Sequence, residues 1–354
     1  MFLGLCCAMG VTALQAAPPS DEVCAWQTSA SGGAFPQTHD ESQDGEGLVV
    51  GADCERSLAV NAVASSKWLA FGLGVERQCI HAKEYVFETG GGRKVSELSW
   101  RSAHSLWVRA GVTFRPLERV QLRAQAAMTV GAKHSFMRDL DWTTNAPQPT
   151  RLSEHDDTQL RRGYEYQIEA AANVLQTRIC GNPLDLNLLF SWSRTVYEWS
   201  AQGGIFQHEG GVSGTFPPNV RMIGYRQQWT TPEIGLQLGQ QIHLREGGEL
   251  HLSVRADWGF WGRFKPLDRH YQRRLAYVDA GHGAKSERWS VKLSWLPRAN
   301  AEFFVTGAWR KFEQGRTDTT IFEFGDSQAL VRIESGGGAR IQSAVIGLGV
   351  RCRF

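Results

Sequence analysis

Strict alternation of apolar and polar residues, repeated along most of the 354-residue chain, is the feature that most constrains its fold. Successive side chains of a β-strand point to opposite faces, so a period of two predicts strands with one apolar and one polar face. The pattern begins after Trp68 and is clearest in the segments 120–128, 184–192, 250–260, 289–295 and 344–354. A content of 38 Gly and 13 Trp with only 12 Pro favours long strands, tight turns and aromatic belts over a helical enzyme.

The C-terminal segment "SAVIGLGVRCRF" is the most specific of these signals. Its apolar face ends on Phe354, and its opposite face carries Gly347, Gly349, Arg351 and Arg353. An alternating last strand that ends on an aromatic residue resembles the terminal strand of bacterial outer-membrane barrels, which meets lipid on one face and a polar interior on the other. Further aromatic residues stand at the ends of apolar faces, namely Trp100, Trp142, Trp295 and Trp309.

We therefore predict an all-β fold, a closed antiparallel transmembrane β-barrel. Typical strand and turn lengths divide the region after Trp68 into roughly 8–12 strands, and the barrel must close because lipid tolerates no open sheet edge. A soluble β-sandwich also alternates, but it explains neither the aromatic positions nor the N-terminal segment, which resembles an export signal.

Three regions are predicted along the chain. Residues 1–17 are interpreted as a signal peptide, because an apolar core is followed by small residues. A lipoprotein signal at Cys6 or Cys7 is the alternative, and it fits less well because little apolar sequence precedes either residue. Residues 18–66 are polar and predict a poorly ordered extension, and residues 67–354 form the barrel.

The cysteines fit an exported chain without specifying its disulfides. Cleavage after residue 17 would leave Cys24, Cys54, Cys79, Cys180 and Cys352. Their spacings match no zinc pattern, and export places them in an oxidising compartment. Cys24–Cys54 is one candidate bridge, but the spacing does not establish the pairing.

Two pairs of charged residues with i, i+2 spacing stand on separate predicted strands. Asp139 and Asp141 lie in "RDLDW", and Asp268 and His270 lie in "DRHY". Residues two apart share a strand face, so each pair projects from one side of its strand. An aspartate orients a neighbouring imidazole, and two further acids could help to bind and activate a water molecule. Spacing alone leaves open whether these charges are catalytic or form a structural network inside the barrel.

The chain carries an ordered series of motifs separated by segments typical of loops. They are "GGRKVSELSW" (91–100), "RDLDW" (138–142), "DTQL" (157–160), "FPPNVRMIGYRQQW" (216–229), "DRHY" (268–271), "NAEFFVTGAWRK" (300–311) and the closing "RF". In type and order these motifs resemble those of the omptin family of outer-membrane aspartyl-type proteases, over residues 70–354.

The resemblance implies a ten-stranded barrel with long extracellular loops and an active-site groove at the extracellular end. It implies that the two charged pairs face each other and that an activated water molecule attacks the peptide bond. His270 is then the general base, and Asp268 supports its ring. Asp139, helped by Asp141, positions the water. No cofactor or metal is expected, and the chain contains no Gly-x-Ser-x-Gly or His-Glu-x-x-His motif.

Family members prefer basic residues at the cleavage site and bind them with acidic side chains. Glu84 matches one of these acids, whereas Pro266 occupies the position of the second, two residues before Asp268. The resemblance thus predicts an outer-membrane endopeptidase that cuts at or next to basic residues, less strictly than its relatives. His155 lies where the family also has a histidine, and we interpret it as structural because its spacing gives it no role.

Family members also bind lipopolysaccharide through a basic cluster on the outer wall, and this lipid activates them. Here Arg194 and Arg226 are the candidate phosphate-binding residues, and Gln228 stands where an arginine is expected. The expected partners are therefore peptides or proteins with basic residues, outer-membrane lipid and lipopolysaccharide. The formal net charge of +2 makes no case for nucleic acid, which we do not expect as a partner, and we expect a monomer.

The rival interpretation is a non-catalytic barrel of the same shape, acting as an adhesin or a surface receptor. Binding would then use the long loops and the N-terminal extension. A porin fits less well, because roughly ten strands leave little open lumen.

Overall fold

The computed structural model describes residues 68–353, apart from residues 91, 132, 146, 180, 245–246, 299–300 and 327. In this part of the chain no helix is long and apolar enough to cross a membrane. The strands described are β1 (Leu69–Phe87), β2 (Lys94–Leu117), β3 (Val120–Thr129), β4 (Lys133–Asp141), β5 (Arg151–Ile179), β6 (Asn182–Gln202), β7 (Ile205–His208), β8 (Ser213–Thr215), β9 (Arg221–His243), β10 (Glu249–His270), β11 (Leu275–Arg298), β12 (Ala301–Glu323) and β13 (Ala329–Arg353).

Several predictions from the sequence fall outside the described residues. The signal peptide, the polar extension, Cys24, Cys54, Cys180 and Phe354 are among them, so these interpretations stay predictions. Within the described residues, Cys79 is disulfide-bonded.

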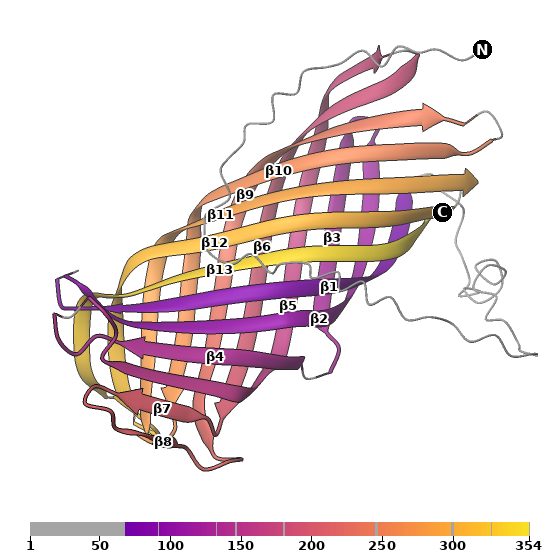
Figure 1. The fold of residues 1–354 in the computed structure, drawn as a ribbon. Coiled ribbons are helices and arrows are strands. Elements are labelled where there is room, and N and C mark those ends of the chain that lie inside the picture. Colours follow the sequence, from indigo (N-terminus) through magenta and orange to yellow (C-terminus); the bar gives the residue numbers. More distant parts are fainter. Residues whose placement is uncertain are drawn as a thin grey trace, which may run out of the picture. The chain divides into compact units, whose positions relative to one another are not determined.

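Antiparallel pairing closes the sheet into a ring (Figure 1). β13 runs beside β1 from the pair Ala70–Arg353 to the pair Val86–Gly337, so the first and last strands of the ring meet. β3 and β4 follow each other in the space between β2 and β5 and pair with both, so together they act as one barrel strand. The described chain then forms a ring of ten, with the order β1, β2, β3/β4, β5, β6, β9, β10, β11, β12, β13. The predicted ten-stranded antiparallel barrel is confirmed.

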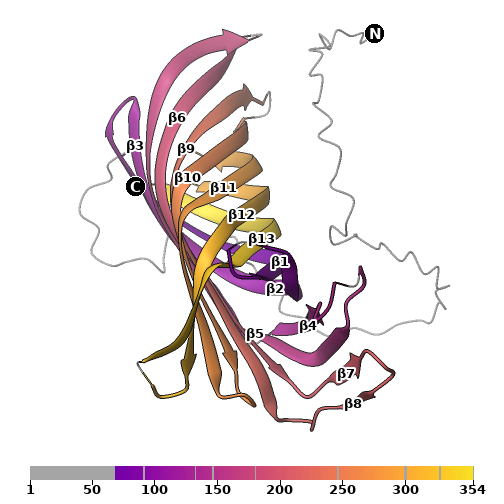
Figure 2. The same cartoon turned by 90° about the vertical axis from the view of Figure 1, so that its left-hand side faces the viewer.

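β7 and β8 form a small hairpin outside this ring. β7 pairs with the beginning of β5, and β8 pairs with β7. Both views place this hairpin at the end of the barrel away from the C-terminus (Figures 1 and 2).

The half of the barrel in which β1 begins and β13 ends has an apolar outer surface and a charged interior. Along β11, the outward side chains of Trp289, Val291, Leu293 and Trp295 are between 44% and 49% exposed. On β13, Ile346 and Leu348 are likewise exposed, as the alternation predicts. We call this part the membrane half, because such an outward apolar band meets lipid in outer-membrane barrels.

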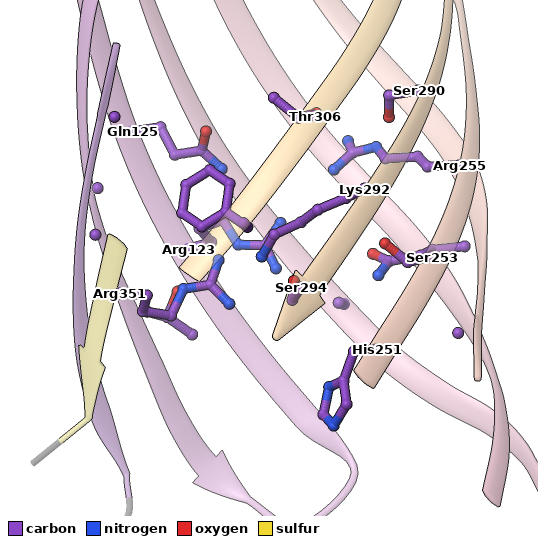
Figure 3. A pocket seen from close by; sticks show the side chains of 18 of the residues that line it. Arg123, Gln125, His251, Ser253, Arg255, Ser290, Lys292, Ser294, Thr306 and Arg351 are labelled. Atoms are coloured by element: carbon purple, nitrogen blue, oxygen red, sulfur yellow. The ribbon is translucent and has the colours of Figure 1, made fainter. Parts of the chain in front are cut away.

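Charged side chains inside the membrane half are paired with opposite charges. Glu165 lies 3.5 Å from Arg109, 3.3 Å from Arg288 and 3.2 Å from Arg310. Figure 3 shows the cavity of about 680 Å³ that remains here, with Arg123, Arg255, Lys292 and Arg351 pointing into it. Polar side chains thus occupy the lumen as expected for a small barrel.

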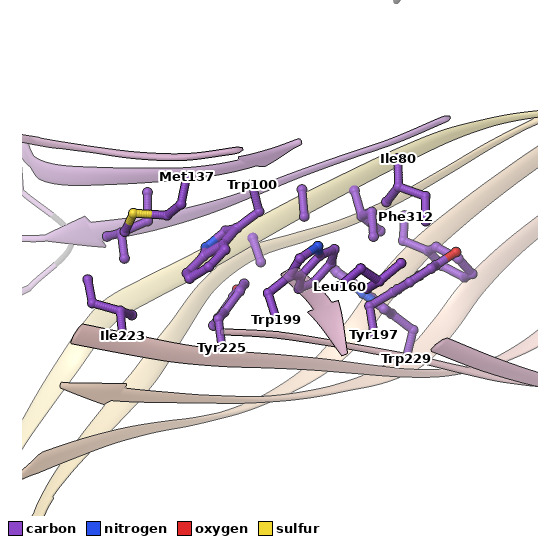
Figure 4. Close-up of a cluster of buried hydrophobic side chains, with 14 of the residues drawn as sticks. Ile80, Trp100, Met137, Leu160, Tyr197, Trp199, Ile223, Tyr225, Trp229 and Phe312 are labelled. Atoms are coloured by element: carbon purple, nitrogen blue, oxygen red, sulfur yellow. The ribbon is translucent and has the colours of Figure 1, made fainter. Parts of the chain in front are cut away.

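A layer of buried aromatic side chains lies in the lumen (Figure 4) and adjoins this cavity at Tyr197, which lines it. Trp100 on β2 stacks on Tyr225 on β9 at a centroid distance of 5.5 Å, and Trp199 Nε1 on β6 donates to Ser102 Oγ on β2 at 2.8 Å. The layer comprises Trp100, Trp107, Tyr197, Trp199, Tyr225, Trp229, Phe264 and Phe312. On β12, Arg310 lines the cavity, Phe312 belongs to the layer and Gln314 follows beyond it. We call the part of the barrel beyond this layer the site half.

The position of Trp100 corrects the prediction that it belongs to an outer aromatic belt, because its side chain is fully buried in the lumen. The cause is a change of register in β2, where Gln78 pairs with Ser105 but Ile80 pairs with Ser102. His104 lies in this bulge with a φ of 64°. One extra residue reverses which side chains of a strand face inward. Odd-numbered residues of β2 therefore face the lumen in the membrane half, whereas the even-numbered Trp100 faces it beyond the bulge.

The position of Trp142 also corrects the prediction that it belongs to the outer aromatic belt. It follows the end of β4 in the site half, where Lys94 Nζ lies 4.6 Å from its ring centroid. Because the strands continue well beyond the apolar band, an aromatic residue at a strand end is not at the membrane surface. Trp295 and Trp309 lie on strand segments of the membrane half, and Trp295 is exposed as predicted.

Candidate functional site

Asp268 and His270 lie together near the end of β10, in the site half. His270 Nε2 lies 2.7 Å from Asp268 Oδ2, so the predicted contact between these two side chains is present. Asp268 is 3% exposed, and its second oxygen, Oδ1, has no hydrogen-bond partner in the described structure. The ring of Tyr277, from β11, meets the His270 ring edge-on at 5.1 Å. The imidazole is thus held from two sides.

Asp139 and Asp141 occupy the end of β4, which lies between β2 and β5. Asp139 is opposite Leu98 on β2 and Ser153 on β5. The hydroxyl of Ser96 donates to Asp139 Oδ1 at 3.3 Å. Asp139 and Asp141 are both half-buried, which leaves these carboxylates partly accessible from the open end of the barrel.

The two pairs share one electrostatic environment. The pKa of Asp139 is raised to about 7, first by burial and then by the charge of Asp141, while His270 opposes the rise. Burial lowers the pKa of His270, but Asp268 and then Asp139 more than offset this effect, so the pKa of His270 is raised. Each group therefore influences the protonation of the other near neutral pH. Proton transfer to and from a bound water molecule suits such an arrangement.

Glu84, the predicted substrate-binding acid, lies beside the same groups. It is 5% exposed on β1, and its Oε2 has no partner in the described structure. Burial raises the pKa of Glu84 well above its usual range, and Asp268, Asp279 and Asp139 raise it further. Within the described part of the chain no cation pairs with Glu84, and a buried carboxyl among other acids favours the binding of one.

Asp279 is the site acid that sequence reasoning missed. It projects from β11 with only 3% exposure, and it influences the pKa of Glu84. The pKa of Asp279 is raised to about 6, chiefly by burial; the hydroxyl of Thr319 opposes the rise, and Asp268 adds to it. The signal that could have found it is the hairpin from β10 to β11, which places the residues after His270 beside those before it.

Within the described residues, the side-chain contacts of His155 are with Gly203, Ser153 and Phe216, and none of these belongs to the two charged pairs. Its side chain is 1% exposed, its Nδ1 donates to the carbonyl of Gly203 at 2.5 Å, and its ring stacks on Phe216 at 5.4 Å. Burial lowers the pKa of His155, which keeps the ring neutral. These contacts fix the segment after β6 and agree with the structural interpretation.

Arg194 and Arg226 meet on the outer wall, on β6 and β9. Arg194 Nη2 donates to Gln228 Oε1 at 2.9 Å, and Arg226 Nη2 lies 3.4 Å from the same oxygen. Arg226 Nη2 also lies 3.4 Å from the hydroxyl of Tyr164. The glutamine at the position of the expected arginine therefore links the two basic side chains. Elsewhere, no group of three or more His, Cys, Asp or Glu among the described residues is arranged to hold a metal ion.

Comparisons with known proteins agree with this architecture. The model of the omptin family matches residues 68–354. The plasminogen activator of Yersinia pestis is 23% identical over 273 residues, which cover 77% of this chain and 85% of the relative. The outer membrane protease IcsP of Shigella flexneri is 28% identical over 252 residues, covering 68% and 76%. Protease 7 of Escherichia coli O157:H7 is 25% identical over 288 residues, covering 76% and 88%.

A solved structure supports the fold independently. The crystal structure of the outer membrane protease OmpT from Escherichia coli superposes with a TM-score of 0.74 at 22% identity, and the match covers 83% of this chain and 99% of that one. The family match spans the whole barrel described above. The chain belongs to the omptin family and has the fold of an outer-membrane β-barrel.

Proposed function

We propose that the protein is an outer-membrane endopeptidase that hydrolyses peptide bonds at or next to basic residues, with its site facing the extracellular side. The observation that carries the proposal is the 2.7 Å contact between His270 and Asp268, with Asp139 close enough to shift the pKa of His270. The names of the relatives, which are proteases, support the same reaction.

His270 acts as the general base in the proposed mechanism. Its Nε2–H donates to Asp268 Oδ2, so the lone pair of Nδ1 is free to take a proton from water. The water oxygen attacks the peptide carbonyl carbon while its proton passes to His270. The resulting imidazolium is stabilised by Asp268 and returns the proton to the leaving amine. Water forms the new bond directly, so no acyl-enzyme arises.

Asp139 and Asp141 hold the water from the opposite wall. An ionised Asp139 accepts a hydrogen bond from the water and keeps its oxygen directed at the carbonyl. Asp141 raises the pKa of Asp139, so the ionised form of Asp139 is reached only near neutral pH. The aromatic layer lies in the lumen between the site and the charged cavity.

The preference for basic residues follows from the charge of the site half. Asp268, Asp279 and Asp139 all raise the pKa of Glu84, and His270 is the cation that lowers the pKa of Asp139. A substrate ammonium or guanidinium would reduce this excess of negative charge.

Lipopolysaccharide is the proposed activating lipid. Arg194 and Arg226 stand together on the outer wall, on the same strands as the exposed apolar residues Trp192 and Ile234. Two guanidinium groups directly beside an apolar band suit the phosphates of a membrane lipid, which lie at the same depth.

A peptide assay on intact cells tests the proposed function. Cells with the wild-type protein should cleave a fluorogenic peptide that contains Arg-Arg, and His270→Ala should lower the rate by about 10²–10⁴-fold. The matched control is His134→Ala, because His134 is exposed on β4. Both variants should keep the gel shift of a folded barrel. Full activity of His270→Ala would refute the mechanism, and no cleavage by the wild type would favour an adhesin or receptor.

A further inference from the structure

Pro266 and Asp279 are neighbours across the β10–β11 ladder. Phe264 pairs with Gly281 and Leu267 pairs with Val278, and no register shift lies between these pairs. The same register places Asp279 opposite Pro266. Opposed residues of an antiparallel pair have Cβ atoms about 5 Å apart. A carboxyl is therefore present one strand away from the position at which the acid is missing.

The side chain of Asp279 reaches over small residues of β13. A Cβ added to Gly337 would overlap Asp279 Oδ2, so this glycine makes room for the carboxyl. Ala339 follows two residues later on the same face, and Ala339 is the partner of Glu84 on β1. Gly337 and Ala339 thus form a shallow floor between the two acids.

Buried acceptor atoms without partners surround this floor. Gln314 on β12 pairs with Ala339 from the other side, is 7% exposed and leaves Oε1 unpaired. Glu84 Oε2 and Asp268 Oδ1 are also unpaired and buried within the described structure. These oxygens accept hydrogen bonds, so the missing group is a donor. An ammonium offers three donors and a guanidinium five, with no acceptor.

We propose that Asp279 is the second anion of the pocket that holds the basic side chain of the substrate. Glu84 and Asp279 bind the cation from two sides over Gly337 and Ala339, with Gln314 as a further acceptor. The proposal rests on the proposed protease function and specifies its substrate pocket. It also reverses the expectation that Pro266 loosens specificity, because the charge lost from β10 is supplied by β11.

Two peptides that differ in one side chain test the assignment. One carries arginine at the position before the cut, and the other carries citrulline, its neutral analogue of nearly the same shape. The measured quantity is the ratio of kcat/KM for the arginine peptide to kcat/KM for the citrulline peptide. Asp279→Asn should lower this ratio by about 10- to 100-fold, since one charged hydrogen bond is lost. The control Asp326→Asn, in the exposed turn after β12, should leave it unchanged.

A compensating substitution separates a charge effect from damage to the fold. Asp279→Asn combined with Pro266→Asp returns a carboxyl to the opposite position and should restore most of the ratio. If Asp279→Asn does not fold, Gly337→Ala provides the second route, because its methyl group displaces the Asp279 carboxyl.

The outcomes are distinguishable. An unchanged ratio in Asp279→Asn overturns the inference while the protease function stands. An equal loss for both peptides also overturns it, because it assigns Asp279 a structural role. If the wild type cleaves neither peptide, the proposed function fails and the pocket assignment fails with it.

Discussion

Glu165 and Glu84 are both buried carboxylates that face the barrel lumen, but their surroundings are opposite. Glu165, in the membrane half, is 6% exposed and is contacted by three arginines. Glu84, in the site half, is 5% exposed, lies among other acids and leaves Oε2 without a partner. Burial is therefore the same at the two positions, and charge matching differs. The charges around Glu165 compensate one another, whereas the excess of acids around Glu84 marks a candidate site for a cationic ligand.

Replacing each glutamate by glutamine should have opposite effects on stability. Glu165→Gln leaves three arginines without their anion and should lower the free energy of unfolding by about 3–5 kcal/mol. Glu84→Gln removes an unpaired carboxylate and should raise it by about 1 kcal/mol at neutral pH. The measurement is the temperature at which the folded band disappears on unboiled gels. A loss of stability in Glu84→Gln would show that this carboxylate is matched by a group not identified here.

The effect of Glu84→Gln on stability should depend on pH, because the pKa of Glu84 is raised in the folded protein. An acid whose folded pKa is raised stabilises the fold below its unfolded pKa and loses that contribution as pH rises through the folded pKa. The ordinary pKa of a glutamate is 4.5, so the wild type should lose stability as pH rises from there towards the raised folded pKa of Glu84, and Glu84→Gln should lose less of it. Parallel curves for the two proteins would contradict the assignment of the shift to Glu84.

Asp141→Asn should move the acid side of the pH–rate profile to lower pH. Asp141 raises the pKa of Asp139, which stands at about 7, so removing this charge lets Asp139 ionise earlier. The expected shift is on the order of one pH unit, and kcat/KM should be measured from pH 5 to pH 8. A shift to higher pH would mean that protonated Asp139 is the active form.

The smallest expected effect concerns the outer wall, where two arginines share one glutamine and face no acid in the contacts seen. Arg194→Ala with Arg226→Ala should reduce activation by lipopolysaccharide by about 10-fold or less, because contacts of half-buried charges on an outer surface contribute little. Detergent-refolded protein, assayed with and without the lipid, gives the measurement. Undiminished strong activation in this double variant would place the lipid site elsewhere. The control is Arg263→Ala, because Arg263 is an exposed residue of β10.

Local pattern was enough to predict the barrel and the composition of the two charged pairs. The alternation around Val291 and Leu293 determines which side chains face outward, because the period of a strand is a property of a few consecutive residues. The spacing of Asp268 and His270 places them on one face for the same reason. The motif series then predicted that the two pairs belong to one site, and the coupled pKa values of Asp139 and His270 agree with this.

Contacts between strands were decided only by the tertiary structure. The bulge at His104 turns Trp100 into the lumen, and the alternation of residues around it does not predict this bulge. The register between β10 and β11 places Asp279 opposite Pro266, although thirteen positions of chain separate them. The sequence by itself determines which side chains of a short strand segment share one face, since this depends on neighbouring residues alone. Register and bulges depend on the partner strand, so the charge surrounding Glu84 was set only when the sheet closed into a ring.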